Sequence, residues 1–170
     1  MLPKLRNFFC FVYVSIIIGL FHILGGFILS IITYIGLNFE VEVTDDITDE
    51  PIQFSYGCAE DDEYQLAVKE KQFTTQFVYQ IMDTDDPFWA MHEYNLQYSP
   101  HNFEKAKKTF NQLCAFLNEL IPEGDYCEIF VCWLGDENEP MAVKRIIDLK
   151  NPILEPLEHY ENCYIKFYKS

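Results

Sequence analysis

The sequence predicts an α+β protein: one N-terminal transmembrane helix followed by a mostly antiparallel β-sheet with one long amphipathic helix packed on it. Three observations support this fold class. Residues 8–37 contain no Asp, Glu, Lys or Arg, the stretch from Ser99 to Leu120 repeats apolar residues at helical spacing, and most remaining apolar runs alternate with polar residues as strands do. The chain therefore divides into a short cytoplasmic N-terminus (1–7), a transmembrane anchor (8–37) and an acidic extracytoplasmic domain (38–170).

The apolar run from Phe8 to Leu37 is 30 residues long, which corresponds to about 45 Å of helix at about 1.5 Å per residue. Because the hydrocarbon core of a bilayer is roughly 30 Å thick, one span fits and two antiparallel spans do not. A cleaved signal peptide is the main alternative, but it needs a much shorter apolar region and a small-x-small cleavage site. A re-entrant loop bent at Gly25-Gly26 is a second alternative. We predict an uncleaved, single-pass signal-anchor.

Basic residues set the orientation of this anchor. Lys4 and Arg6 precede it, whereas the first basic residue after it is Lys69. Positive charge stays on the cytoplasmic side, so the N-terminus is predicted to be cytoplasmic and the C-terminal domain extracytoplasmic. That location is the periplasm or cell surface in a bacterium, and an organelle lumen, the exterior or the intermembrane space in a eukaryote.

Small residues spaced four apart in the anchor permit close approach of a second helix, and a polar group at mid-span usually faces protein rather than lipid. The alternative is that Gly and Ser are simply common in transmembrane helices. The helix-packing candidates are Ser15, Gly19, His22, Gly26 and Ser30.

All 27 acidic residues and 10 of the 12 basic residues follow Leu37, so the domain carries a net charge of −17. Nucleic acid and anionic lipid headgroups are therefore excluded as expected ligands, and a protein partner with a basic surface is favoured. The alternative is that the acidity only keeps the domain soluble. With 133 residues, it has the size of one ordinary domain.

The domain contains an odd number of cysteines, which leaves at least one thiol unpaired in an oxidising compartment. Cys127 and Cys132 lie on one predicted strand with side chains on opposite faces, so they do not pair with each other. The candidate disulfide joins Cys127 to Cys163, on two different strands. The absence of a C-x-x-C motif argues against a thioredoxin-like site or a zinc knuckle.

Alternating residues predict strands at 39–43, 52–56 and 93–98. The stretch 64–82 fits both a strand and a helix, and its β-forming residues favour a strand. A firm break follows at Asp83 to Pro87.

The clearest element of the domain is the helix that Ser99 caps and Pro122 ends. Residues 126–134 and 141–149 read as the two strands of an antiparallel hairpin, the first central and covered on both faces. A short helix is expected at 153–160. A last strand is expected at 163–168, with Cys163, Ile165 and Phe167 on one face.

No catalytic signature is present. His92-Glu93 begins like H-E-x-x-H, but Leu96 occupies the position of the second histidine. Asp83, Asp85 and Asp86 lack the Gly and distal Glu of an EF-hand loop, and no glycine-rich phosphate loop occurs. The sequence therefore predicts a protein that is not an enzyme, with no metal site and no cofactor.

Two surface features are candidates for partner binding. Phe88, Trp89 and Met91 have the composition of a binding hot spot, although aromatic residues in such a domain are usually core. The acidic turn after the predicted central strand is either a docking point for Lys and Arg or a solvated hairpin end. Its candidate residues are Asp136, Glu137 and Glu139.

These observations predict a non-enzymatic, membrane-anchored interaction protein whose acidic domain binds a protein partner outside the cytoplasm. In size, charge and architecture the domain resembles the immunity proteins of bacterial toxin systems, which implies a toxin-neutralising role. The alternative is an accessory single-span subunit of a multi-protein membrane complex, in which the small residues and His22 of the anchor would make the contacts.

Overall fold

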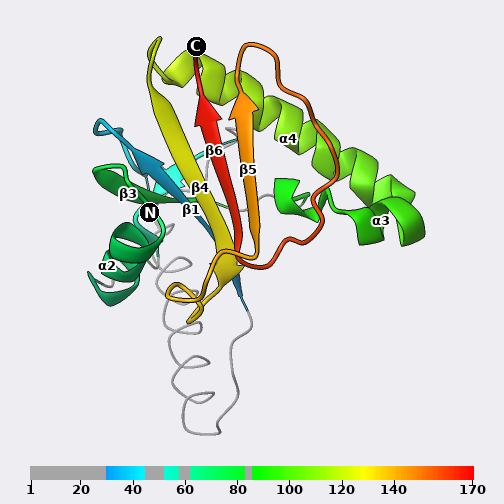
Figure 1. Cartoon of the computed structure of the whole chain (residues 1–170), viewed down its shortest axis with the longest axis horizontal. Helices are drawn as coiled ribbons and strands as arrows, with labels where there is room; N and C mark the ends of the chain where they lie inside the picture. Colours follow the sequence, from blue (N-terminus) through cyan, green and yellow to red (C-terminus); the bar gives the residue numbers. More distant parts are fainter. Residues whose placement is uncertain (1–29, 45–51, 58–61, 83–85) are drawn as a thin grey trace, which may run out of the picture. The chain divides into compact units, whose positions relative to one another are not determined.

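The structure, a computed structural model, describes residues 30–44, 52–57, 62–82 and 86–170. The chain divides into two compact units, Met1–Ser30 and Ile31–Ser170. Every helix and strand described below belongs to the second unit (Figure 1). Two predicted segments lie outside the described residues: the cytoplasmic N-terminus (1–7) and the part of the anchor at 8–29.

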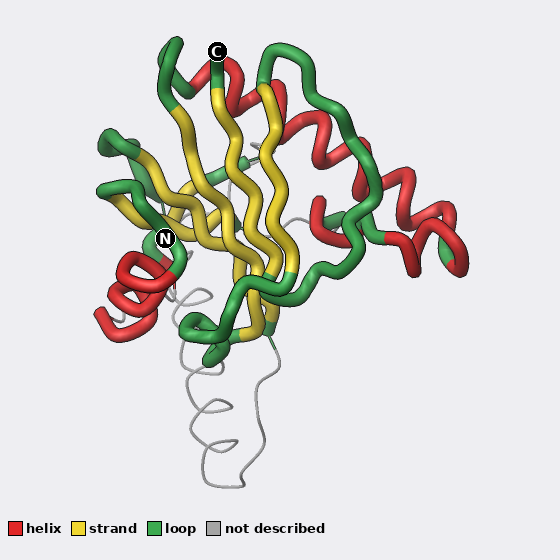
Figure 2. The backbone as a smooth tube through the Cα atoms, viewed as in Figure 1, coloured by secondary structure: helices red, strands yellow, loops and turns green. Residues whose placement is uncertain are grey.

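One sheet forms the centre of the second unit (Figure 2). Its strands are β1 (Ile31–Leu37), β2 (Phe54–Ser55), β3 (Phe77–Ile81), β4 (Tyr126–Trp133), β5 (Val143–Asp148) and β6 (Cys163–Tyr168). In space the order is β2-β3-β1-β4-β6-β5, and all neighbours are antiparallel except β5 and β6. The predicted α+β class, with a long helix on a mostly antiparallel sheet, is confirmed.

The longest helix, α4 (Pro100–Leu120), covers one face of the sheet, as the sequence predicts (Figure 1). It begins with Pro100 at its first position, where the missing N–H costs no helical hydrogen bond. Its apolar stripe packs on the buried residues of the central strands. The buried residues of the helix are Phe103, Ala106, Phe110, Leu113, Cys114 and Leu117.

A shorter helix, α2 (Asp62–Lys71), lies against the opposite face of the sheet (Figure 1). Val68 of this helix and Phe73 after it pack on apolar residues of β1, β3 and β4. β4 is therefore buried on both faces, which confirms its predicted central position. The short 3₁₀ helix η2 (Phe88–Ala90) and helix α3 (Glu93–Tyr98) precede α4.

The predicted anchor extends too far toward the C-terminus. Residues 31–37 are β1, which pairs with β3 on one side and β4 on the other, and Ser30 lies directly before it. A strand that is buried on both faces needs no polar alternation, so its sequence is indistinguishable from membrane-spanning helix by hydropathy. Among the described residues, none of the helices is sufficiently long and apolar for a membrane span.

Three short predictions of secondary structure were wrong. Within 64–82, a strand forms only at β3, and α2 occupies the earlier part. Residues 93–98 are helix α3 rather than a strand, because their alternation does not mark a buried face: Tyr94 and Tyr98 are both exposed. Residues 39–43 form no strand ladder, although their apolar side chains still pack against the core of the α4 face.

The predicted hairpin of β4 and β5 is also wrong, because β6 lies between them. β6 buries Cys163, Ile165 and Phe167, as predicted, and so suits the interior of the sheet. β5 carries exposed Lys144 and suits the edge. The connection 149–162 runs along the α4 face and contains no helix, so the helix expected at 153–160 is absent.

Candidate binding groove

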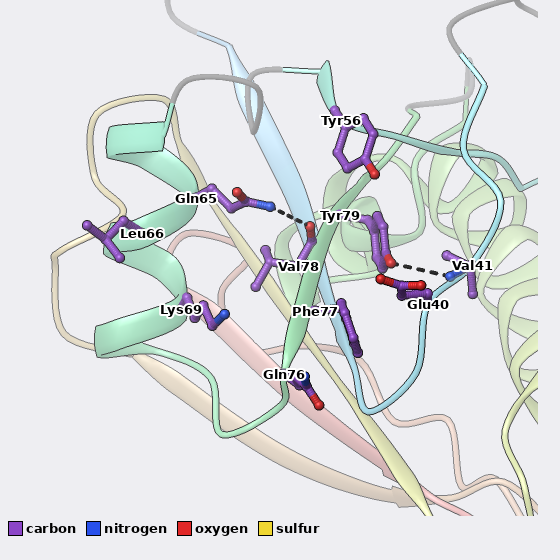
Figure 3. A pocket seen from close by; sticks show the side chains of 10 residues that line it. All are labelled: Glu40, Val41, Tyr56, Gln65, Leu66, Lys69, Gln76, Phe77, Val78 and Tyr79. Atoms are coloured by element: carbon purple, nitrogen blue, oxygen red, sulfur yellow. Dashed lines mark hydrogen bonds between the residues drawn. The ribbon is translucent and has the colours of Figure 1, made fainter.

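A groove of about 680 Å³ runs along the outer edge of β3, between α2 and the segment that follows β1 (Figure 3). Among the described residues this edge is open, because β2 is only two residues long and pairs with β3 at Gln80 and Ile81 alone. The residues that line the groove are Glu40, Val41, Tyr56, Gln65, Leu66, Lys69, Gln76, Phe77, Val78 and Tyr79.

Two tyrosines and a carboxylate meet at one end of the groove. The rings of Tyr56 and Tyr79 have centroids 6.0 Å apart and are tilted by 35°. The carboxylate of Glu40 lies beside the hydroxyl group of Tyr79 (Figure 3), and that hydroxyl accepts a hydrogen bond from the N–H of Val41 at 3.3 Å. We call Glu40, Tyr56 and Tyr79 the tyrosine corner; the name refers only to these three residues and not to the motif of that name in Greek-key sandwiches.

The electrostatics of the tyrosine corner favour a positive ligand. Burial is the main cause that raises the pKa of Tyr79, and the neighbouring Tyr56 and Glu40 raise it further. Tyr79 is therefore a neutral phenol at physiological pH, and Glu40 supplies the negative charge. Tyr56 is 41% exposed, so its ring is accessible from solvent.

Helix α2 forms the opposite wall of the groove. The side-chain amide of Gln65 donates to the carbonyl oxygen of Val78 at 2.9 Å and so fixes the helix to the edge of β3. Leu66 is 52% exposed and Lys69 is also exposed on this wall. A ligand in the groove would therefore contact Leu66 and Lys69 on α2 and the acidic and aromatic side chains of the tyrosine corner on the opposite wall.

A buried carboxylate holds the connection between α2 and β3 in place. Glu128 of β4 is 1% exposed. Its Oε2 accepts from the N–H groups of Thr74 and Thr75 at 2.7 and 2.9 Å. Its Oε1 accepts from the hydroxyl groups of Thr74 and Tyr164 at 2.9 and 2.7 Å. Four donors satisfy the charge, so this carboxylate positions one wall of the groove.

The same contact explains the glycine in β1. Gly36 lies directly opposite Glu128 in the β1–β4 ladder. A Cβ atom at position 36 would collide with the side chains of Thr75 and Phe73. Only glycine lets the connection approach the sheet closely enough for Glu128 to bind its N–H groups.

The predicted aromatic partner-binding residues are part of the core. Phe88 and Met91 are 5% and 0% exposed, and Phe88 stacks on Phe110 with centroids 5.5 Å apart. Trp89 is partly buried, and its ring lies 5.3 Å from that of Tyr160. The structure thus agrees with the alternative that these side chains serve packing.

The three acidic residues predicted to bind a partner in the turn between β4 and β5 differ in their exposure to solvent. Glu139 is exposed and Asp136 is half-buried, but Glu137 is 1% exposed. Glu137 accepts hydrogen bonds from the hydroxyl of Tyr34 and from the N–H of Gly135, both at 2.9 Å. It therefore stabilises the turn from within and is removed from the predicted docking surface.

The predicted disulfide does not form. Cys127 and Cys163 are free and buried, and in the β4–β6 ladder they pair with Phe167 and Val131 instead of with each other. Val131, the residue opposite Cys163, lies four positions after Cys127 in β4, about 13 Å away at about 3.3 Å per residue, which is beyond disulfide reach. Of the anchor candidates, Ser30 is half-buried just before β1. The other four, which lie outside the described residues, are Ser15, Gly19, His22 and Gly26.

The tyrosine corner was missed by sequence reasoning because its residues come from three separate segments. Glu40 and Tyr56 belonged to two predicted strands and Tyr79 to a third. One signal was present: Tyr56 precedes Gly57 and a run of acidic residues, a composition typical of an exposed loop.

Comparison with protein-family models, with curated proteins and with solved structures gives no match.

Proposed function

We propose that this chain is a membrane-anchored, non-enzymatic interaction protein that binds a basic segment of a protein partner in the groove along β3. The observation that carries the proposal is the tyrosine corner, in which the accessible ring of Tyr56 and the exposed carboxylate of Glu40 lie beside the buried ring of Tyr79 at the edge of β3. The domain is proposed to lie on the extracytoplasmic side, as the charge distribution around the N-terminal apolar run favours.

The chemistry of the corner suits a Lys or Arg side chain. A cation over the face of a tyrosine ring gains about 0.5–2 kcal/mol, depending on how far it is desolvated. The carboxylate of Glu40 adds a charge-assisted hydrogen bond. The net charge of −17 on residues 38–170 would also attract a basic partner over longer distances.

The anchor proposed here is shorter than hydropathy alone suggests. Because β1 begins at Ile31, residues 8–29 remain for the membrane span. Their 22 residues correspond to about 33 Å of helix, which matches a hydrocarbon core of roughly 30 Å. This shorter span needs no large tilt and leads almost directly into the first strand of the domain.

Site-specific photo-crosslinking of the full-length protein in its native membrane tests the proposal. A benzoylphenylalanine at position 56 replaces Tyr56 with another aromatic group inside the groove. The expected product is a covalent adduct with one protein whose crosslinked peptide contains Lys or Arg. Mass spectrometry of the adduct identifies the partner: a secreted toxin would support the immunity role, and integral membrane subunits would support the accessory-subunit alternative.

Two controls separate the groove from the remaining surface. The same probe at Tyr98, which is 64% exposed on α3, is expected to give no such adduct. Glu40→Gln in the position-56 probe background is expected to reduce the yield several-fold, whereas Glu119→Gln on α4 leaves it unchanged. Equal yields from positions 56 and 98, or a yield insensitive to Glu40→Gln, would contradict binding in the groove.

A further inference from the structure

The outer side of β5 carries main-chain groups that no other described residue satisfies. At the end of this strand Leu149 N donates to Tyr168 O of β6 at 2.9 Å. In a parallel ladder each residue directs its N–H and C=O to one side, and the side alternates from one residue to the next. Since Leu149 faces β6, Lys144 and Ile146 direct their N–H and C=O groups away from β6. Across the described ranges, no hydrogen bond reaches these outward groups.

The connection between β5 and β6 packs on the α4 face of β5, and its Ile153 and Glu155 line a cavity of about 220 Å³ together with Ile146. Leu157 of this connection is buried in the core of that face. Arg145, whose side chain shares the face with Ile147, donates to Glu155 Oε2 at 3.2 Å and to Pro156 O at 2.9 Å. The side chains of Lys144, Ile146 and Asp148 alternate to the opposite face, and Ile146 is 72% exposed.

We infer that β5 pairs antiparallel with β5 of a second copy of this chain, which joins the two sheets into one. The register places Ile146 opposite Ile146 of the second copy, on a two-fold axis. Lys144 then lies opposite Asp148 of the second copy, and Asp148 opposite Lys144. Lys144 and Ile146 have their backbone groups and side chains on the side that this register requires. At Asp148 the main-chain oxygen accepts from Asn151 N at 3.1 Å and Oδ1 accepts from Lys150 N at 3.0 Å, so the second copy meets the N–H group and the other carboxylate oxygen of Asp148.

The charge pattern of the strand selects this occupant. Exposed edge strands are commonly protected from pairing by a lysine, and Lys144 would oppose most incoming strands in this way. In the two-fold register, however, Lys144 of each copy faces Asp148 of the other copy, and the two exposed Ile146 side chains cover each other. The pairing is isologous and uses the same strand of both copies, so it closes as a dimer and does not propagate into a fibre. This surface is separate from the groove along β3, and the inference does not depend on the proposed function.

Cysteine crosslinking of the full-length protein in membranes tests the register. Residues opposite each other in a hydrogen-bonded antiparallel pair have Cα atoms about 5.5 Å apart, within disulfide reach. Ile146→Cys is therefore expected to form a disulfide-linked dimer under mild oxidation, at least about fivefold above the parent protein. Leu96→Cys is the matched control, because Leu96 is 46% exposed but lies on α3 rather than on the sheet. Equal dimer yields at positions 146 and 96, or no dimer at 146, would overturn the inference.

Charge exchange in the Ile146→Cys background tests the cross-strand pairs. Lys144→Asp places two acidic residues opposite each other at both ends of the pairing and is expected to lower the dimer yield severalfold. Asp148→Lys does the same with basic residues. The double variant restores opposite charges and is expected to recover the yield. A double variant that stays as low as the single variants, with an unchanged circular dichroism spectrum, would rule out this register.

Discussion

The two faces of the sheet bury their residues in different ways. Under α4 lies a cluster of apolar side chains contributed by the helix and every strand of the sheet. Under α2 a smaller apolar cluster lies beside two buried carboxylates: Glu128 binds the connection between α2 and β3, and Glu137 binds the hydroxyl group of Tyr34 in β1. The α4 face is therefore stabilised mainly by burial of apolar area, and the α2 face depends on individual polar contacts.

Removing a large side chain from the α4 face is expected to have the largest effect. Phe110 is 1% exposed, stacks on Phe88 and meets the ring of Phe167 edge-on with centroids 5.9 Å apart. Phe110→Ala removes these contacts and leaves a cavity, so the free energy of unfolding is expected to fall by about 3–5 kcal/mol. Urea unfolding followed by circular dichroism measures the change. Tyr98→Ala, at an exposed aromatic, is expected to stay within about 0.5 kcal/mol of the parent.

On the α2 face, Glu128→Gln is expected to have a smaller but more local effect. The amide of Gln can keep its oxygen on the N–H groups of Thr74 and Thr75, but its NH2 then faces the hydroxyl groups that donate to Oε1 of Glu128, and the charge that strengthens all four bonds is lost. Hydrogen bonds to a charged group are worth about 1.5–3 kcal/mol, and a loss of this order in the free energy of unfolding is expected.

Hydrogen exchange separates this effect from a general loss of stability. In Glu128→Gln the amides of α2 and of residues 73–76 are expected to exchange faster, while those of α4 keep their protection. Glu119→Gln, at an exposed acid on α4, serves as the control. Uniformly faster exchange in both helices would mean that the two faces unfold as one unit.

The same difference explains what the sequence predicts and what it does not. α4 was predicted with its buried face because Phe103, Phe110 and Leu117 recur at helical spacing, and β6 because Cys163 and Phe167 alternate inward. Such periodicity can be recognised within a short stretch of sequence. Which strands pair with each other depends on residues far apart in the chain, so the position of β6 between β4 and β5 was missed.

Long-range polar contacts leave no local pattern. Glu128 and Thr74 are 54 residues apart, and Tyr34 and Glu137 are 103 apart. The tyrosine corner likewise forms only once the chain is folded. β1 shows the limit of hydropathy itself, because its seven residues, six of them buried in the sheet, continue an apolar run without any visible boundary.

The smallest of the expected effects concerns His92, a polar residue at the margin of the α4 face. It is 8% exposed, and its Nδ1 accepts from Asn95 N at 3.4 Å as the N-cap of α3. Burial is the main cause that lowers the pKa of His92 below 6.5, and the nearby His159 contributes. The unfolded chain therefore takes up a proton at His92 before the folded protein does as the pH falls.

The stabilising contribution of neutral His92 is complete above its unfolded pKa of 6.5 and declines as the pH falls below that value toward the folded pKa. In thermal unfolding followed over this range, His92→Asn is expected to reduce the acid-dependent loss of Tm, because Asn still accepts a hydrogen bond at the N-cap but does not titrate. His101→Asn, at an exposed histidine, controls for the general effect of losing an imidazole. If both variants lose Tm as steeply as the parent protein, the buried imidazole of His92 does not couple protonation to folding, and the margin of the α4 face is as insensitive to pH as its apolar centre.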